Sequence, residues 1–339
     1  MINDFRKATL TDYGHQLFLV IASIVLTGWI IRLSGGDPLL LFKSFYSVIS
    51  SSAFLWLVLD LAGILLIASA GSSMALEGGV YNTGAEGQFI AGFAVAGIVF
   101  ANAGDGVLFL SLAGGALVGT CLMALVLQSL VPRSGLMSSK CRENLVIRGL
   151  LSNFIVLGAL GSFIVLPVKT FFFPLFQAPS SVESSSLVSQ TILSSLAHPS
   201  SVLFLALALY GATKYILVHL QFGLTLRSGV NHMSLYQRLF FSLLTGGLCG
   251  VSGAALFLCG PSLISTIGFV EGIGTLSFAI AFAARGGLWL FLLPLTFVYS
   301  VIATGWDYAA FGNQSIMAAA IALLLVVSIV PLKDRGESS

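Results

Sequence analysis

The stretch that decides the fold is "LEGGVYNTGAEGQFIAG", from Leu76 to Gly92. It concentrates glycines and polar side chains, although the sequence on both sides is strongly apolar. In hydrocarbon every unpaired backbone group is costly, so a broken helix is tolerated only where it is buried in protein or lines a water-filled cavity. We therefore expect the glycines to break a membrane helix here. The polar side chains then either pair with the freed backbone groups or contact a polar solute.

The composition of the whole chain is that of a membrane protein. Of its 339 residues, 57% are hydrophobic and only 8% are charged, whereas soluble domains carry about 25% charged residues. Apolar runs near the roughly 20 residues that a spanning helix needs recur from end to end. The four cysteines (Cys121, Cys141, Cys249 and Cys259) have no paired spacing and no neighbouring histidine, so we expect no metal site. These features predict an all-α, polytopic helical membrane protein that is a single domain over residues 1–339.

The apolar runs predict about ten transmembrane segments, and the first is expected to be a retained helix rather than a removed signal peptide. The segments at 86–103 and 270–284 are short and glycine-interrupted, and residues 34–50 are expected to form a connection along the outer interface. The predicted segments are 17–33, 53–75, 86–103, 107–130, 144–168, 199–220, 239–259, 270–284, 287–305 and 314–332.

The distribution of basic residues sets the orientation. If both termini are cytoplasmic, all 15 Lys and Arg residues except Arg32, Lys43 and Lys169 fall on the inner side, in keeping with the positive-inside rule. The longest connection, residues 169–200, then lies outside. The small-residue stretches "AGGALVG" (113–119) and "TGGLCGVSGA" (245–254) indicate close helix packing, either within the bundle or at a partner interface.

A second glycine-interrupted stretch occurs in the other half of the chain. "STIGFVEGIGTLSFAIAFAARGG", Ser265 to Gly287, places Glu271 among glycines. Paired interruptions of this kind indicate a transport site, and an intramembrane acid indicates a functional site. Glu77 and Glu86 either cap helix ends at the inner interface or line the path. Asp60, midway through an apolar run, is expected to be protonated, paired or turned toward the bundle interior.

Several motifs, in the same order, resemble the permease subunits of ATP-binding-cassette importers. "GGVYNTGAEGQFIAG" is similar to the G-[VL]-F-N-I-G-x-E-G-Q motif of the branch that serves nucleosides and simple sugars. "NLVIRGLLSNFIV" (144–156), "FGLTLRSGVNHMSLYQRLFFSLLTGGLCGVSGA" (222–254) and "GIGTLSFAIAFAARGG" (272–287) resemble later motifs of that family. The resemblance covers roughly residues 50–330. The chain departs from the pattern at Glu77, where the family often has arginine, and in "HMSLYQ" after Asn231.

The resemblance implies that the chain forms half of a pore in the inner membrane of a bacterium. Separate cytoplasmic ATPase subunits, which bind ATP and Mg, would drive it, and an outer substrate-binding protein or lipoprotein would deliver the solute. A related second permease subunit is expected as the partner, a heterodimer before a homodimer. The chain itself has no P-loop motif and is not expected to be an enzyme or to bind a cofactor. The expected ATPase-coupling loop is 221–238, with the candidate residues Leu226, Arg227, Asn231, His232 and Arg238.

The expected solute is nucleoside-like or riboflavin-like, with ribose or another simple sugar as the alternative. Polar side chains would bind its hydroxyl groups, and aromatic residues such as Tyr81 and Phe89 would stack on a flat ring. The candidate pathway residues are Tyr81, Asn82, Thr83, Glu86, Gln88, Ser152, Asn153, Glu271 and Thr275.

The sequence also bears on three other classes of protein. A proton-coupled secondary transporter would use Asp60, Glu86 or Glu271 as its relay. A channel would need a selectivity filter, and no repeated filter motif is present. An intramembrane enzyme would need a nucleophile with its base or a metal cluster, and the sequence shows neither.

Overall fold

A computed structural model gives the structure of the chain. It describes residues 37–102, 107–128, 139–159, 201–227, 233–259, 272–284 and 292–308, with single positions at 21, 25, 28, 29 and 32. The predicted segment 314–332 and the predicted outer loop 169–200 lie outside the described residues. The predicted segment 17–33 is described only at the single positions.

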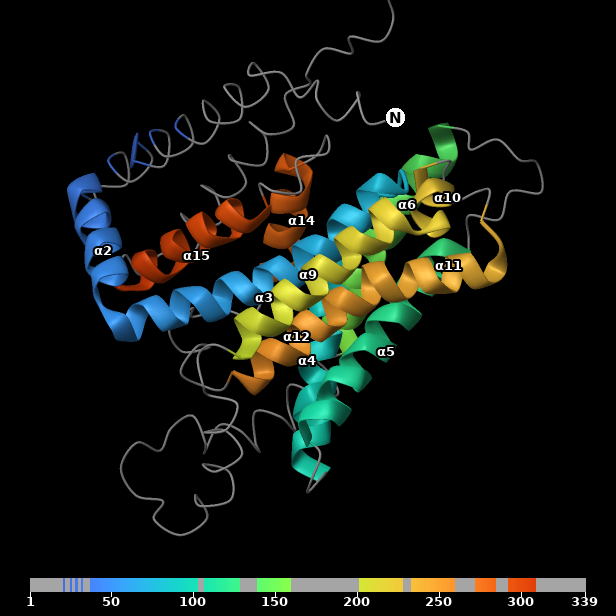
Figure 1. Cartoon of the computed structure of the whole chain (residues 1–339), viewed down its shortest axis with the longest axis horizontal. Helices are drawn as coiled ribbons and strands as arrows, with labels where there is room; N and C mark the ends of the chain where they lie inside the picture. The colour runs from blue at the N-terminus through green and yellow to red at the C-terminus, as the bar shows by residue number, and fades with distance from the viewer. Residues whose placement is uncertain are drawn as a thin grey trace, which may run out of the picture.

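Helices form almost all of the described part, which contains no strand. Most begin and end within a few residues of the predicted segments, because each apolar run is long enough to satisfy its own backbone as a helix. In chain order (Figure 1) they are α2 (Pro38–Ser50), α3 (Ser52–Glu77), α4 (Ala85–Asn102), α5 (Val107–Gln128), α6 (Ser139–Ala159), α9 (Ser201–His219), α10 (Gln221–Arg227), α11 (Leu235–Ser242), the π-helical turn η4 (Leu243–Gly247), α12 (Leu248–Leu258), α14 (Ile273–Ala283) and α15 (Leu292–Tyr308).

Four helical stretches in the described part are long and apolar enough to cross a membrane: Leu55–Glu77, Val107–Leu127, Val202–His219 and Leu235–Leu258. The chain is therefore a helical protein with candidate membrane spans, as its composition predicts. The described part does not establish the predicted number of ten. The two segments predicted to be short and interrupted are short helices in the structure, α4 and α14.

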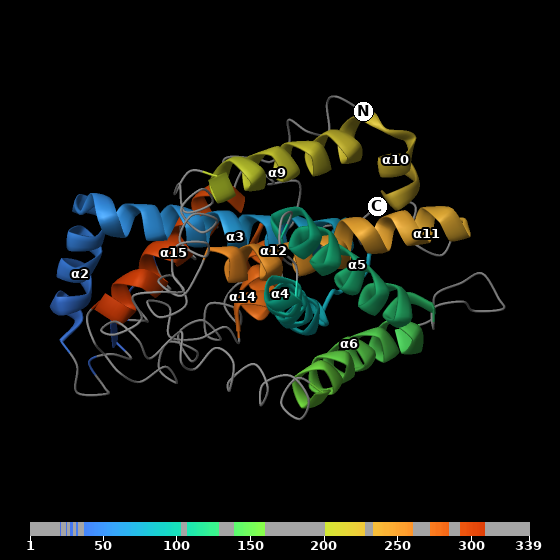
Figure 2. The same ribbon diagram turned by 90° about the horizontal axis from the view of Figure 1, so that it is seen from below.

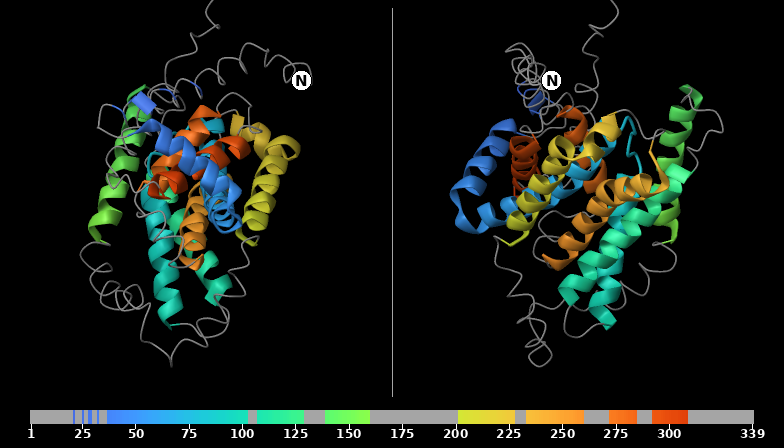
Figure 3. Two further views of the ribbon diagram at one scale, coloured as in Figure 1. Left: turned by 90° about the vertical axis from the view of Figure 1, so that its left-hand side faces the viewer. Right: turned by 45° about the vertical axis from the view of Figure 1, so that its right-hand side comes forward.

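Helix α3 runs through the middle of the bundle. It packs against α9, α12, α14 and α15, which come from the second half of the chain, and Figure 1 shows it crossing behind α9. On the other side α4, α5 and α12 all pack against one another, and α6 lies at the edge against α4 and α5 (Figure 2). Helices α2 and α15 lie together at one side of the molecule (Figure 3). The two halves are thus packed into each other.

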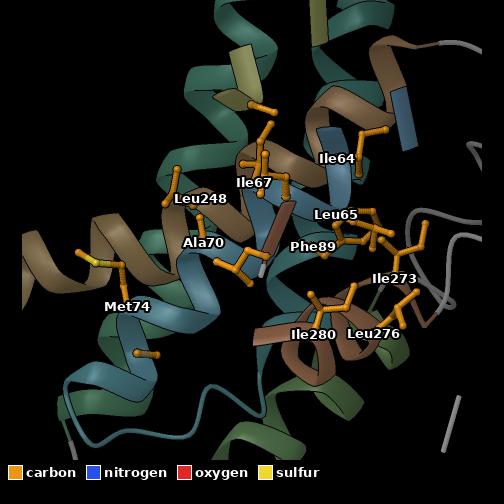
Figure 4. Packing of buried hydrophobic residues seen from close by; sticks show 14 of the residues in the cluster. Ile64, Leu65, Ile67, Ala70, Met74, Phe89, Leu248, Ile273, Leu276 and Ile280 are labelled. Carbon is orange, nitrogen blue, oxygen red and sulfur yellow. The ribbon is translucent and has the colours of Figure 1, made fainter. Parts of the chain in front are cut away.

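The apolar core lies where α3, α4, α12 and α14 meet (Figure 4). Phe89 of α4 is fully buried there beside Ile64 and Leu65 of α3 and Ile273 and Ile280 of α14. This position overturns one expectation for Phe89: in this structure its ring is part of the core and is not open to a solute.

Within the connection expected at 34–50, residues 38–50 form a capped helix. Pro38 occupies the first helical position, where its fixed φ suits a helix and its missing N–H is not needed. The Asp37 carboxylate accepts a hydrogen bond from the Leu39 N–H at 3.0 Å, which satisfies one of the free donors of the first turn.

Glycines bring α4, α5 and α12 together at backbone distance. A Cβ atom on Gly92 or Gly115 would meet the carbonyl oxygen of Gly250, and one on Gly250 would meet that of Gly115. The small-residue stretches at 113–119 and 245–254 therefore pack on each other within the bundle, which decides between the two alternatives left open by the sequence.

Replacing Gly250 by alanine is expected to destabilise the bundle by about 1–3 kcal/mol, because the added methyl group forces two backbones apart. The measurement is the thermal unfolding midpoint of the purified protein in detergent. Gly211→Ala is the matched control, since a Cβ on Gly211 meets no atom within 4 Å, and it should leave the midpoint unchanged or slightly higher. Equal effects of the two substitutions would contradict the close approach.

Candidate functional site

The break between α3 and α4 is built by two glycines. Gly78 ends α3, and Gly79 has a φ of 74°, a left-handed conformation that residues other than glycine adopt at a cost. The N–H of Val80 then donates to the carbonyl oxygen of Ala75 at 2.9 Å, the closing bond of a Schellman-type helix end. The predicted interruption is present, and the chain crosses it in residues 78–84.

Inside this break, Asn82 and Gln88 pair with each other. The Asn82 Nδ2 donates to Gln88 Oε1 at 2.9 Å, and Gln88 Nε2 donates to Asn82 Oδ1 at 3.1 Å. Both side chains are buried, with 2% and 0% of their surface exposed. The remaining amide hydrogens point at the sulfur atoms of Cys249 and Met123 at 3.7 and 3.6 Å. The two predicted pathway residues therefore lie inside the protein and satisfy each other.

A second amide, Asn153 of α6, holds the start of α4. Its Oδ1 accepts from the Gly87 N–H at 2.7 Å, and its Nδ2 donates to the carbonyl oxygen of Thr83 at 2.8 Å. The Thr83 hydroxyl in turn donates to the carbonyl oxygen of Val146 on α6 at 3.0 Å. Ser152 turns back on its own helix and donates to the Gly149 carbonyl oxygen at 2.7 Å. The structure thus brings the candidate pathway residues Thr83 and Asn153 together, and here they hold the backbone at the start of α4.

The Glu86 carboxylate joins the two halves of the chain. Its Oε1 accepts from the Gly272 N–H at 2.5 Å, and its Oε2 accepts from the N–H and the hydroxyl of Thr275 at 2.7 and 3.2 Å. Gly272, with a φ of 96°, is the N-cap residue of α14 and has no side chain with which to cap it. Glu86 itself stands in the first turn of α4. The carboxylate thus lies at the N-termini of both α4 and α14, where a negative charge is stabilised.

The two helix starts are held in backbone contact as well. A Cβ on Gly274 would lie 2.5 Å from the Cα of Glu86, so only glycine fits this position of α14. The glycine at 274 therefore lets the start of α14 approach the backbone of Glu86 closely.

One side of α14 remains accessible. Thr275 is exposed, and Phe278 and Phe282 are half-buried, whereas most of the helix is buried in the core. The half-buried ring of Tyr81 lies 6.4 Å from that of Phe282, centroid to centroid, and Phe278 lies 6.3 Å from Phe282. We call Tyr81, Thr275, Phe278 and Phe282 the α14 stripe. Sequence reasoning missed its two phenylalanines, although their spacing of three and seven residues from Thr275 places all three on one helix face.

The predicted coupling residues lie in different environments. Leu226 of α10 is fully buried, and it packs with Phe241 of α11 over Gly78, so that a Cβ on Gly78 would lie 2.9 Å from the Leu226 side chain and 3.0 Å from the Phe241 ring. Arg238 is half-buried in the first turn of the continuous helix Leu235–Leu258. Only the backbone of Arg227 is described, and Asn231, His232 and Glu271 lie outside the described residues.

Asp60, the candidate relay acid of the apolar run, is half-buried in the first half of α3. Its Oδ1 has no hydrogen-bond partner among the residues that the structure describes. The same residues contain no group of three or more His, Cys, Asp or Glu side chains able to hold a metal ion.

Comparisons of the chain with protein-family models, with curated proteins and with solved structures found no match.

The Asn82–Gln88 pair makes a prediction about stability. Asn82→Leu and Gln88→Met should each cost about 1–3 kcal/mol, because each leaves a buried amide without its partner. The double variant should cost clearly less than the sum of the two. A double-mutant cycle on thermal unfolding in detergent measures this coupling, and simple additivity would show that the two amides do not depend on each other.

The Glu86 contacts make a second prediction. Glu86→Ala should destabilise the protein by about 1–3 kcal/mol, since it leaves the donors at the start of α14 without an acceptor. Glu77→Ala, which removes a half-buried acid from the end of α3, is the matched control and should change stability by less than about 0.5 kcal/mol. If hydrogen exchange at the start of α14 is equally slow in both variants, the carboxylate does not hold that helix.

Proposed function

We propose that the chain is the transmembrane permease subunit of an ATP-binding-cassette importer. It forms half of the translocation pathway for a nucleoside-like or riboflavin-like solute, and separate ATPase subunits supply the energy. The membrane in question is the inner membrane of a bacterium. The proposed assembly holds a second, related permease subunit and an outer binding protein or lipoprotein.

The observation that carries this proposal is the meeting of two interrupted helices within an apolar bundle. Transporters commonly place their solute site where discontinuous helices from two halves of the fold bring their N-termini together. Here α4 and α14 do so through Glu86. Asn153 holds the backbone at the start of α4, and the Asn82–Gln88 pair satisfies its own buried amides, so the break before α4 is a stable part of the fold.

The accessible chemistry beside this junction supports the class of solute. Thr275 offers an exposed hydroxyl group, and the rings of Tyr81, Phe278 and Phe282 follow on the same side. Such a surface suits a solute that has both hydroxyl groups and a flat ring. A simple sugar, the alternative solute, has no flat ring and would use only the hydroxyl group of Thr275.

Contacts on the predicted inner side support a role for residues 221–238 in coupling. The Phe222 ring of α10 packs edge-on against Phe240 of α11 at 4.9 Å, and Leu226 packs on Gly78 at the helix break. Movement of α10 and α11 would therefore reach the break directly. At the start of α11, Leu235 and Tyr236 are 70% and 83% exposed, which offers an ATPase subunit an apolar contact.

A proton-coupled secondary transporter is the second candidate, and Asp60 favours it. A carboxylate oxygen without a partner in the described part of an apolar helix is the kind of group that proton relays use. In that case uptake would collapse with the proton gradient and would not need an ATPase.

The deciding experiment is reconstitution of the complex with its ATPase and binding protein in proteoliposomes. The importer proposal predicts ATP hydrolysis that rises with a nucleoside or riboflavin, and uptake that survives an uncoupler. Tyr236→Ala should reduce both ATPase co-purification and uptake several-fold. Tyr215→Ala, at a residue of α9 that is 59% exposed, should change neither. Uptake by the chain without an ATPase, driven by a pH gradient and lost in Asp60→Asn, would replace the importer by the secondary transporter.

A further inference from the structure

We propose that the α14 stripe is a two-ended subsite for a neutral solute that carries both hydroxyl groups and a flat ring. The hydroxyl groups bind at Thr275 beside Glu86, and the ring stacks at Phe282 and Tyr81. The proposal rests on the proposed transport function and deepens it, because it orients the solute and excludes its phosphorylated form.

The spacing of the stripe gives it two ends. Thr275, Phe278 and Phe282 lie on one face of α14, and seven residues of α-helix span about 10 Å. The segment from Tyr81 to Glu86 lies along the same face, because Tyr81 meets Phe282 and Glu86 meets Thr275. One end is therefore polar and the other is aromatic.

The polar end is suited to water and hydroxyl groups rather than to lipid. A carboxylate facing hydrocarbon is costly, so ionisable groups in bundles turn toward the interior or a water-filled cavity. Glu86 keeps 7% of its surface exposed, and the exposed Thr275 hydroxyl beside it donates its hydrogen to Oε2. The Thr275 oxygen can then accept a hydrogen bond from a solute hydroxyl.

The same carboxylate sets the charge of the solute. Helix N-termini attract phosphate groups through their free N–H groups and their dipole. At the start of α14 those donors are already taken by Glu86, so an incoming phosphate meets a negative charge in place of free donors. A neutral nucleoside is accepted on this basis and a nucleotide is rejected.

The aromatic end distinguishes a ring-bearing solute from a free sugar. Tyr81 and Phe282 come from different elements, and their ring planes are inclined by 34°. Both are half-buried, so each ring keeps part of its surface available for stacking. Loss of one stacking ring commonly weakens binding of a base by about tenfold or more.

The test is equilibrium binding to the full chain in lipid nanodiscs. The probes are adenosine and riboflavin, which carry a ring and hydroxyl groups, ribose, which lacks the ring, and adenosine 5′-monophosphate, which adds the anion. At least one ring-bearing probe should bind more tightly than ribose, and adenosine should bind more tightly than its monophosphate. Phe282→Leu keeps an apolar side chain but removes the ring, and it should weaken the ring-bearing probe about tenfold while leaving ribose unchanged.

Two further variants complete the design. Glu86→Gln should reduce the preference for adenosine over its monophosphate, because it removes the charge and keeps an acceptor for α14. Phe154→Leu, on a face of α6 where this residue is 70% exposed, is the matched control for Phe282→Leu and should alter no affinity. Thermal unfolding of each variant shows whether it remains folded.

Failure of the subsite is distinguishable from failure of the importer. The subsite is overturned if neither ring-bearing probe binds, if Phe282→Leu and Phe154→Leu behave alike, or if the monophosphate binds as well as adenosine to the unaltered chain. Binding with the expected pattern by a chain that, in the reconstitution experiment, neither co-purifies with an ATPase nor gives solute-stimulated ATP hydrolysis would keep the subsite and remove the importer. Solute-stimulated ATP hydrolysis that is unchanged in Phe282→Leu would remove the subsite and keep the importer.

Discussion

A single carboxylate between two helix N-termini is the interaction on which the rest of the structure depends. Glu86 stands in the first turn of α4 and accepts hydrogen bonds from Gly272 and Thr275 at the start of α14. Without an acceptor, those part-buried donors would lose their hydrogen bonds at the edge of an apolar bundle, which is costly. With it, the charge is stabilised by two helix dipoles. One residue of the first half thereby fixes the position of an interrupted helix of the second.

Asn153 of α6 and the other polar groups of the opening stretch stabilise that arrangement in an apolar setting. Asn153 supplies an acceptor to Gly87 and a donor to Thr83, while Asn82 and Gln88 satisfy each other. These side chains, which the sequence predicts to line a pathway, therefore stabilise the fold. The residues left to contact the proposed solute are those that stay accessible, the α14 stripe. The polar residues around the break thus divide into those that hold the backbone, such as Asn153, and those that stay accessible, such as Thr275.

Much of this fold follows from the sequence. Long apolar runs predict helices such as α3 and α5, and the glycines at 78 and 79 predict the break, because only glycine readily takes the left-handed conformation found at Gly79. The sequence does not predict which groups the polar residues contact. The sequence left two roles open for Glu86, a helix cap or a residue of the pathway. Its contact with Gly272 joins residues more than half the chain apart. Phe89 and Phe282 are both phenylalanines in apolar stretches, yet packing buries the first and leaves part of the second accessible. Periodicity within α14 would have separated Phe282 from its buried neighbours.

The same packing ties the break to the predicted inner surface. Leu226 and Phe241 both rest on Gly78, so the turn that carries Asn82 and Glu86 is bounded by α10 and α11 on one side and by α14 on the other. In the proposed importer, a shift of α10 or α11 would press on Gly78 through Leu226 and Phe241. It would pass through residues 78–84 to Glu86 and then to the start of α14. Because Thr275, Phe278 and Phe282 of the stripe lie on α14, this route would link the proposed solute contacts to the predicted inner surface.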